Sequence, residues 1–256
     1  MKDAGSIRAL EFVRTVDLPP SPALEGTEGA ADFDFNKAKD QALVVGSDIV
    51  SFVRGVTEER RNDIVNSSLL AQLVATKKVG KSGGIFSWYD AYFEVLGNIG
   101  WVIQSREFTT HKETSTNLDA HKAILAVATT LLGPGATALQ VVKSTLDALK
   151  TMGEDSPFIT LFNRESQHAK TARFQISLAE EEANGRFMVS LMAFALTANA
   201  NLTQVLFFRF RKNDVTLKHA SGKVTINTDV LTSVREPLKQ KILSFTGDFV
   251  RKLPDL

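Results

Sequence analysis

The sequence contains no cysteine, and this absence removes several kinds of chemistry. Disulfide bonds, thiolate catalysis, cysteine-ligated zinc, iron–sulfur clusters and cysteine acylation all need a sulfur atom that this chain does not supply. Net charge is scarce too, because 30 lysine and arginine residues stand against 29 aspartate and glutamate residues. A dedicated nucleic-acid-binding protein usually carries a basic excess, so nucleic acid is not an expected partner.

Long apolar runs are also missing. The longest nearly apolar stretch covers residues 123–133 and ends at Pro134, whereas a transmembrane helix needs about 20 such residues. No apolar segment follows Met1-Lys2-Asp3, so no secretory signal peptide is predicted. We expect a protein that is made in a cytosol and is water-soluble at rest, and that leaves by another route, such as lysis or a dedicated injector, if it acts outside the cell.

Recognisable catalytic and ligand-binding motifs are absent as well. Gly80-Lys81-Ser82 looks like the end of a phosphate-binding loop, but Ala75 stands where that motif needs glycine. The histidines have no metal-ligand spacing, and no G-x-S-x-G elbow occurs. The sequence therefore predicts no enzyme and no catalytic, cofactor-binding or metal site. The histidines are His111, His121, His168 and His219.

Residues 1–256 are predicted to form a single domain, because 43% hydrophobic and 23% charged residues are typical of a globular protein. Residues 1–34 should contain a strand over 7–16 and then a proline-rich loop suited to proteolytic processing. Residues 35–152 should be mostly helical, 153–227 rich in strands, and 228–256 a helix with a kink or restart at Pro237.

Within the helical part, apolar residues at helical spacing predict several helices. Glycine and proline at residues 133–135 interrupt the last of them, so residues 118–152 should form a helical hairpin capped by Thr116 or Asn117. The expected helices cover residues 36–54, 57–76, 87–96, 117–132 and 136–152, with a strand over 101–110 and a loop over 80–84.

After Pro157 the apolar period changes to two, which predicts strands. Residues 186–197 are apolar on both faces and should form a central strand that is covered above and below. Helices on either side of a mainly antiparallel sheet, in three α-β-α layers, satisfy that requirement. The expected strands cover residues 158–162, 172–179, 186–197, 202–212, 214–218 and 223–227.

Charge is distributed unevenly: residues 1–40 are net acidic and residues 203–256 net basic. Arg209, Arg211 and Lys212 gather at one strand end, which makes them candidates for binding anionic lipid headgroups. The alternative is an ordinary rim of solvated charge.

The strands predicted around residues 172–179, 186–196 and 203–212 are close to the ~9–11 residues that a tilted strand needs to cross a bilayer. Insertion would require the covering helices to move away and the strands to pair between chains, because lipid tolerates only a closed sheet. The candidate membrane-insertion residues are Phe187, Val189, Leu191, Leu206, Phe208 and Phe210.

Four short segments stand out within residues 158–224, namely Phe162-Asn163-Arg164-Glu165-Ser166, Phe174-Gln175-Ile176-Ser177, Gly185-Arg186-Phe187-Met188-Val189 and Gln204-Val205-Leu206-Phe207-Phe208. Through these segments, residues 158–224 resemble the Cyt family of bacterial cytolytic toxins, the delta-endotoxins. The resemblance implies a three-layer α-β-α domain with helix pairs around the sheet. It also implies a soluble protoxin trimmed near its termini, binding to membrane phospholipids, homo-oligomers on the membrane, and no enzymatic activity.

One departure from this family concerns the basic residues of the 202–212 strand. A lysine or arginine on the lipid face costs ~2–4 kcal/mol at mid-bilayer, so Arg209, Arg211 and Lys212 should lie at the interface or face a lumen if the strand inserts.

Three hypotheses follow. The first is a pore-forming or membrane-permeabilising toxin. The second is a non-enzymatic structural or binding protein, a subunit or cargo of a bacterial assembly. The third is an enzyme acting on lipid or acyl groups with a histidine as general base.

Overall fold

The computed structural model describes residues 3–21, 33–80, 83–104, 106–112, 117–182, 184–207, 209–211 and 214–254. The helices are α1 (Ala4–Thr15), α2 (Glu58–Val79), α3 (Ile85–Asn98), α4 (Ala120–Leu132), α5 (Thr137–Thr151), α6 (Pro157–Ser166) and α7 (Thr228–Phe249). The main-sheet strands are β1 (Gln41–Val45), β2 (Asp48–Phe52), β3 (Trp101–Val102), β4 (Thr109–Thr110), β6 (Gln167–His168), β7 (Thr171–Glu181), β8 (Phe187–Ala198), β10 (Val215–Ile226) and β11 (Val250–Lys252). A separate two-stranded sheet joins β5 (Asn117–Asp119) to β9 (Arg209–Arg211).

The nine-stranded sheet has the order β11-β1-β2-β7-β8-β10-β3, with β4 beside β10 and β6 beside β7. Of the pairings between described residues, β2 with β7 is parallel and the others are antiparallel. The long strands β7 and β8 form a hairpin whose register runs from Thr171↔Thr197 to Glu181↔Phe187. The predicted mainly antiparallel sheet is confirmed.

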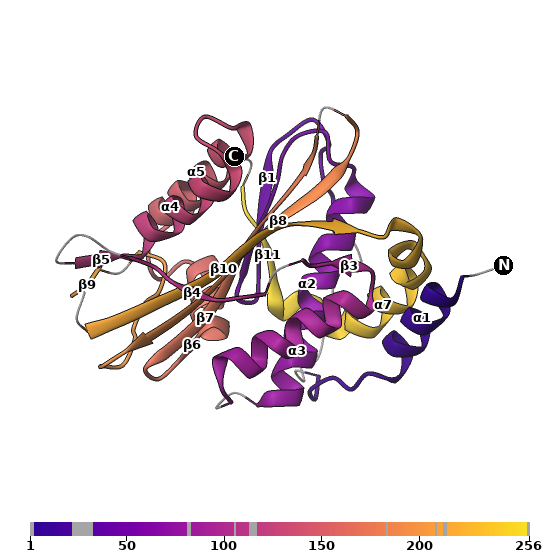
Figure 1. The fold of residues 1–256 in the computed structure, drawn as a ribbon, viewed down its shortest axis with the longest axis horizontal. Coiled ribbons are helices and arrows are strands. Elements are labelled where there is room, and N and C mark those ends of the chain that lie inside the picture. The colour runs from indigo at the N-terminus through magenta and orange to yellow at the C-terminus, as the bar shows by residue number, and fades with distance from the viewer. Residues whose placement is uncertain are drawn as a thin grey trace.

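Helices cover both faces of this sheet, as a strand that is apolar on both sides requires. The helical hairpin of α4 and α5 lies on one side, and α2, α3, α7 and α1 lie on the other (Figure 1). Side chains alternate between the two layers along β7: Phe174 and Ile176 join the core under α4–α5, while Gln175 points the other way, toward α3. The structure is a mixed α/β fold with three layers, as the sequence predicts.

Residues 7–15 belong to helix α1 and Val16 follows it as the C-cap, so the strand predicted over 7–16 is wrong. Asp3 caps helix α1 by accepting a hydrogen bond from the Ser6 backbone N–H at 2.7 Å. Ala9, Leu10 and Val13 share one helical face, and α1 packs against α7. These apolar positions fit both periods over such a short stretch, and packing decides in favour of the helix.

The helix predicted for residues 36–54 is also wrong, because this segment forms the β1–β2 hairpin. Gly46 adopts a positive φ of 55° in the turn, which glycine tolerates at little cost. Both strands are buried on both faces, so their nearly continuous apolar pattern imitates a helical stripe.

The expected strand at residues 158–162 is instead helix α6. The Ser156 hydroxyl accepts a hydrogen bond from the Ile159 N–H. Pro157 occupies the first helical turn, where the backbone N–H that proline lacks would have no acceptor within the helix. The strand predicted for residues 202–212 is mostly wrong too. Leu202, Val205 and Leu206 are buried at irregular spacing, and among the residues of this segment that the structure describes, β9 alone is a strand.

Smaller differences concern element limits. Residues 214–218 and 223–227 belong to one strand, β10, while β3 and β4 are short remnants of the strand expected over 101–110. Asp119 caps α4, instead of Asn117 or Thr116, and Thr116 lies outside the described residues. Helix α7 runs through Pro237 as one element, without a restart.

Two predicted loops fall partly outside the described residues, namely 22–32 of the proline-rich segment and 81–82 of the 80–84 loop. The predicted α2, α3, α4–α5 hairpin, β7 and β8 are confirmed. In the part of the chain that the structure describes, none of the helices combines the length and the apolar character needed to cross a membrane.

Candidate functional site

A largely apolar face of the β7–β8 hairpin lies beneath α4–α5. Phe174 and Phe194 are cross-strand partners on this face, and their rings stack with centroids 4.8 Å apart. Ser190, the cross-strand partner of Leu178, is the polar exception, and its buried Oγ has no hydrogen-bond partner among the described residues. This face depends on its helical cover to stay out of water. The buried residues of this face are Ala172, Phe174, Ile176, Leu178, Met192, Phe194 and Leu196.

The opposite face of β7 is polar. Arg173, Gln175 and Ser177 alternate with the apolar set and point toward α2 and α3. The Gln175 amide donates to the Tyr89 hydroxyl at 3.2 Å, and that hydroxyl also contacts the carbonyl oxygens of Phe174 and Phe194 at 2.8 and 2.7 Å. Strand β7 is thus amphipathic, although both of its faces are covered.

The α4–α5 hairpin is attached to the sheet almost wholly by apolar contacts. Among the described residues, one side-chain hydrogen bond joins the hairpin to the sheet, between Ser51 Oγ and Thr145 Oγ1 at 3.0 Å. The His121 imidazole, whose pKa is lowered by burial, lies 3.6 Å from the Asp147 carboxylate, and this contact links the two helices to each other and does not reach the sheet. Few directional bonds would therefore have to break if the hairpin moved away.

Helix α2 on the other face is attached very differently. The fully buried Arg61 donates to Val56 O at 2.9 Å and Gln41 Oε1 at 2.8 Å, and also to the carbonyl oxygens of Lys39 and Val53. The hydrogen bonds of this one side chain thereby hold the first turn of α2 against the segment where β1 begins and the segment that follows β2.

Gln72 provides a second polar attachment of α2. Its Nε2 donates to Val45 O at 2.8 Å, and its Oε1 accepts from the Ser47 backbone N–H at 2.9 Å. Gly46 lies against this amide, because a Cβ on Gly46 would come within 2.4 Å of Gln72 Oε1. The β1–β2 turn is consequently built around the α2 side chain.

Asp48 is a fully buried carboxyl group between α2 and the sheet. Its Oδ2 accepts from Ser68 Oγ at 2.8 Å and Ser177 Oγ at 2.9 Å, whereas Oδ1 has no partner among the described residues. Burial raises the pKa of Asp48 from 3.8 to about 6, and the two serine hydrogen bonds oppose this rise. The carboxyl group therefore changes its charge near neutral pH.

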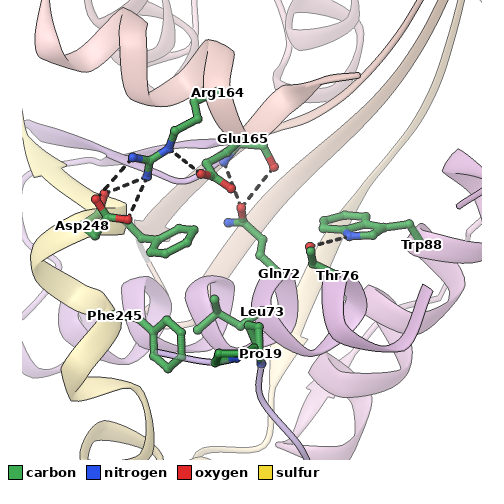
Figure 2. Close-up of a pocket in the computed structure, with 12 residues that line it drawn as sticks. Pro19, Gln72, Leu73, Thr76, Trp88, Arg164, Glu165, Phe245 and Asp248 are labelled. Atoms are coloured by element: carbon green, nitrogen blue, oxygen red, sulfur yellow. Dashed lines mark hydrogen bonds and ion pairs between the residues drawn. The ribbon is translucent and has the colours of Figure 1, made fainter. Parts of the chain in front are cut away.

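A cavity of about 370 Å³ opens at the end of the sheet, where segments distant in sequence meet (Figure 2). Arg164 spans its rim: Nε donates to Glu165 Oε1 at 2.7 Å, and the terminal nitrogens donate to the Asp248 carboxylate at 3.2 and 3.3 Å. The Trp88 indole N–H donates to Thr76 Oγ1 at 3.0 Å. The lining residues are Pro19, Pro20, Ser47, Gln72, Leu73, Thr76, Trp88, Arg164, Glu165, Phe245, Asp248 and Phe249.

The predicted headgroup residues lie in the small β5–β9 sheet. The backbone of Arg209 pairs with Asp119 and that of Arg211 with Asn117, and Arg211 is exposed. Lys212 and Phe208 lie outside the described residues. The structure thus places Arg209 and Arg211 beside the start of α4, at the base of the helical hairpin.

The predicted insertion residues are divided between two places. Val189 and Leu191 lie on β8 in the core on the α2–α3 side, and Phe187 packs against that same core. Leu206 is buried under α4–α5 but follows β8 in an irregular segment, so its assignment to a strand is wrong. Phe210 belongs to β9 and pairs through its backbone with Leu118.

Sequence reasoning therefore missed the face that α4–α5 covers. The strict alternation of Phe174, Ile176 and Leu178 with polar residues was the available signal, and it marks this face more clearly than the β8 pattern does. It also missed the cavity. Among the described residues, no group of His, Asp and Glu side chains could hold a metal ion.

No family model matches the chain, and no curated protein matches it. Solved structures are similar in fold. One is a delta-endotoxin, with a TM-score of 0.43 and 13% identity, over 84% of this chain and 95% of that one. Another is the Evf virulence factor, with a TM-score of 0.40 and 11% identity, over 83% of this chain and 86% of that one.

A third is the activated Cyt2Ba monomer from Bacillus thuringiensis subsp. israelensis, with a TM-score of 0.38 and 13% identity, over 69% of this chain and 96% of that one. The Cyt family that the sequence resembles is thus represented among the solved structures to which this fold is similar.

Proposed function

We propose that this protein is a membrane-permeabilising toxin, in which the α4–α5 hairpin moves away from the sheet and β7 and β8 enter a phospholipid bilayer. The observation that carries the proposal is the contrast between the two covering layers. An apolar strand face lies under a hairpin held by one side-chain hydrogen bond, whereas α2 is attached by a buried polar network.

The strands have suitable dimensions and patterns for this role. Strands β7 and β8 contain 11 and 12 residues, and a tilted strand needs ~9–11 to cross the hydrocarbon core. On β7, the apolar set would face lipid, and Arg173, Gln175 and Ser177 would face a lumen or a partner strand. Closing such a sheet requires several chains, so the membrane-bound form is a homo-oligomer.

The basic residues fit the interface better than the bilayer core. Arg209 and Arg211 lie in β9, outside the long strands, so membrane entry of β7 and β8 does not place them in hydrocarbon. They would contact lipid headgroups at the base of the hairpin. Lys212, which lies outside the described residues, remains a proposed headgroup ligand. In this proposal the protein is made in a bacterial cytoplasm, is released or delivered from it, and acts on the membrane of a target cell.

A disulfide between Ser51→Cys and Thr145→Cys tests the movement of the hairpin. The two hydroxyl oxygens are 3.0 Å apart, and the chain contains no other cysteine, so oxidation can form only this cross-link within one chain. We expect the oxidised variant to bind vesicles but release no trapped dye. Adding a reductant should restore wild-type leakage, measured with anionic and with zwitterionic vesicles.

The reduced form of the same variant is the matched control, and flotation with vesicles measures binding separately from leakage. Equal leakage by the oxidised and reduced forms would contradict hairpin displacement. A wild-type protein that releases no dye before or after mild proteolysis would contradict permeabilisation itself. A large assembly in the absence of lipid would then favour the structural protein of a bacterial assembly.

A further inference from the structure

Lysine side chains gather at the end of the sheet where β1 begins and β11 ends. They border a depression of about 410 Å³ in the surface. Among the described residues of its lining, three lysines stand against one aspartate, so the lining is net positive. Like charges brought together raise each other's energy, and an anion between them removes that cost. The lining includes Asp34, Phe35, Lys37, Lys39, Gln41 and Lys252.

A buried cation adds to this positive charge from inside the protein. The fully buried Arg61 donates to Gln41 Oε1 at 2.8 Å, and its guanidinium carbon lies 5.8 Å from the centroid of the Phe35 ring. Within the described part of the chain, the oxygens that accept hydrogen bonds from Arg61 are all neutral carbonyl or amide oxygens. No hydrogen-bonded carboxylate cancels its charge, so its potential reinforces that of the lysines.

Lys252 is held in position at the wall of the depression. Its Nζ donates to the Asp34 carbonyl oxygen and lies 5.4 Å from the centroid of the Phe35 ring. An ammonium group has three N–H donors, so it can bind an anion while it keeps this contact. The Phe35 ring thus lies between two cations, Lys252 on one strand end and Arg61 on α2.

The neighbouring Asp40 carboxylate is bound to another group. Its Oδ1 accepts from the Arg54 backbone N–H at 2.6 Å, and the Arg54 side-chain Nε lies 3.9 Å away. The charge of Asp40 acts on Arg61 as well. The balance of charge at the depression therefore selects an anion, and phosphate suits lysines, which bind it as point charges.

The depression lies at the same end of the sheet as the turn between β7 and β8. Gln41 on β1 pairs with Phe52, and Phe52 pairs with Ala179 of β7. Two strand spacings of ~4.8 Å place Gln41 about 10 Å from Ala179, and β7 ends soon after, at residue 181. Arg209 and Arg211, by contrast, belong to the segment that joins the other end of β8 to β10.

We propose that this depression, the lysine pocket, binds a phosphate group through Lys37, Lys39 and Lys252. The phosphate belongs either to a free phosphate compound or to the headgroup of an anionic membrane lipid. The lipid source rests on the proposed function, because it requires that the protein acts at a membrane, whereas the free source does not. A lipid in the lysine pocket would hold this end of the sheet, with the β7–β8 turn, against the membrane surface.

Labelling of lysine amines with an activated ester, read by mass spectrometry, tests the site in the wild-type chain. Pyrophosphate is the free probe, and phosphatidylcholine vesicles with or without phosphatidic acid are the lipid probe. We expect Lys37, Lys39 and Lys252 to be labelled about tenfold more slowly once the probe exceeds its dissociation constant roughly tenfold. The exposed Lys77 and Lys170 should keep their rates. Equal protection of all five lysines would overturn the proposal.

Two double variants that lose the same charge measure the affinity. Replacing Lys37 and Lys252 by glutamine should weaken binding of pyrophosphate, followed by calorimetry, or of phosphatidic acid vesicles, followed by flotation, by about 10- to 30-fold. Replacing Lys77 and Lys170 by glutamine should change either affinity by less than about threefold. If the first variant does not fold, as judged by circular dichroism, the labelling of the wild type decides.

The two probes distinguish the sources. Binding of pyrophosphate that the first double variant weakens supports a site for free phosphate compounds, and binding of phosphatidic acid vesicles alone assigns the site to a lipid headgroup. No response to either probe, or equal losses in the two double variants, would overturn the proposal. Dye release is measured separately, so vesicles that bind at the lysine pocket without leaking would contradict the proposed function and leave this site standing.

Discussion

Replacing Asp48 by asparagine is expected to stabilise the fold at pH 7 by about 2–3 kcal/mol more than it does at pH 4. Burial raises the pKa of this carboxyl from 3.8 to about 6 in the folded chain, and each unit of pKa difference corresponds to ~1.4 kcal/mol. The folded state therefore binds the proton more tightly than the unfolded state does. This tighter proton binding at Asp48 stabilises the wild-type fold fully below pH ~4, and the stabilisation is lost as the pH rises through about 6.

Urea unfolding between pH 4 and pH 8 measures this effect as a difference between the two proteins. The asparagine Oδ1 can accept the same hydrogen bonds from Ser68 and Ser177, so the variant should remain folded. Glu94→Gln serves as the control, because this carboxylate is half exposed and should change the curve little. A difference that stays flat with pH, or that favours the wild type as pH rises, would contradict the role assigned to Asp48.

Replacing Arg61 by alanine is expected to lower the free energy of unfolding by about 3–5 kcal/mol. The guanidinium is fully buried, with its carbon 5.8 and 5.3 Å from the ring centroids of Phe35 and Phe52. Truncation would leave the Val56 and Lys39 carbonyl oxygens without this donor and would open a cavity beside both rings. Thermal and urea unfolding measure the loss.

Two further variants make this second result interpretable. Arg61→Met restores most of the lost volume without the hydrogen bonds, so it should fall between the wild type and the alanine variant. Arg54→Ala removes an arginine whose side chain is 68% exposed, and it should change stability by less than about 0.5 kcal/mol. A loss below about 1 kcal/mol in Arg61→Ala would show that α2 is not anchored through this residue.

Anchoring of α2 matters for the proposed function because it decides which layer can move. With Arg61 and Gln72 bound to the β1–β2 segment, α2 and this part of the sheet should behave as one body. The α4–α5 hairpin has no comparable attachment among the described residues. Weakening α2 through Arg61 should therefore lower global stability without reproducing the leakage expected from release of the hairpin.

The sequence predicts best those elements whose pattern admits one explanation. The hairpin of α4 and α5 is long, amphipathic and interrupted by glycine and proline, and β8 is apolar on both faces, so period and length agree. Residues 41–52 fail because a doubly covered strand pair and a buried helix have almost the same apolar content. Residues 7–16 fail because their few apolar positions suit either period.

The candidate sites also differ in how far the sequence alone reveals them. The apolar face of β7 could be recognised from alternation along one strand, since Phe174, Ile176 and Leu178 are local neighbours. The cavity could not, because Pro19, Trp88 and Asp248 come together only through the packing of segments that are distant in sequence. Arg173 carries no sequence mark at all: that it is buried against Trp88, with its Nε atom lacking a hydrogen-bond partner among the described residues, becomes visible only in the structure.

The parallel pairing of β2 with β7 has a consequence for how the chain acquires its structure. Asp48 and Ser177, which meet through this pairing, are 129 positions apart. The centre of the sheet cannot close until the chain as far as β7 has left the ribosome, and β1 stays unpaired on its outer edge until β11 arrives. Such non-local topology predicts slow refolding, in the range of ~milliseconds to seconds, with apolar strand edges exposed to aggregation meanwhile.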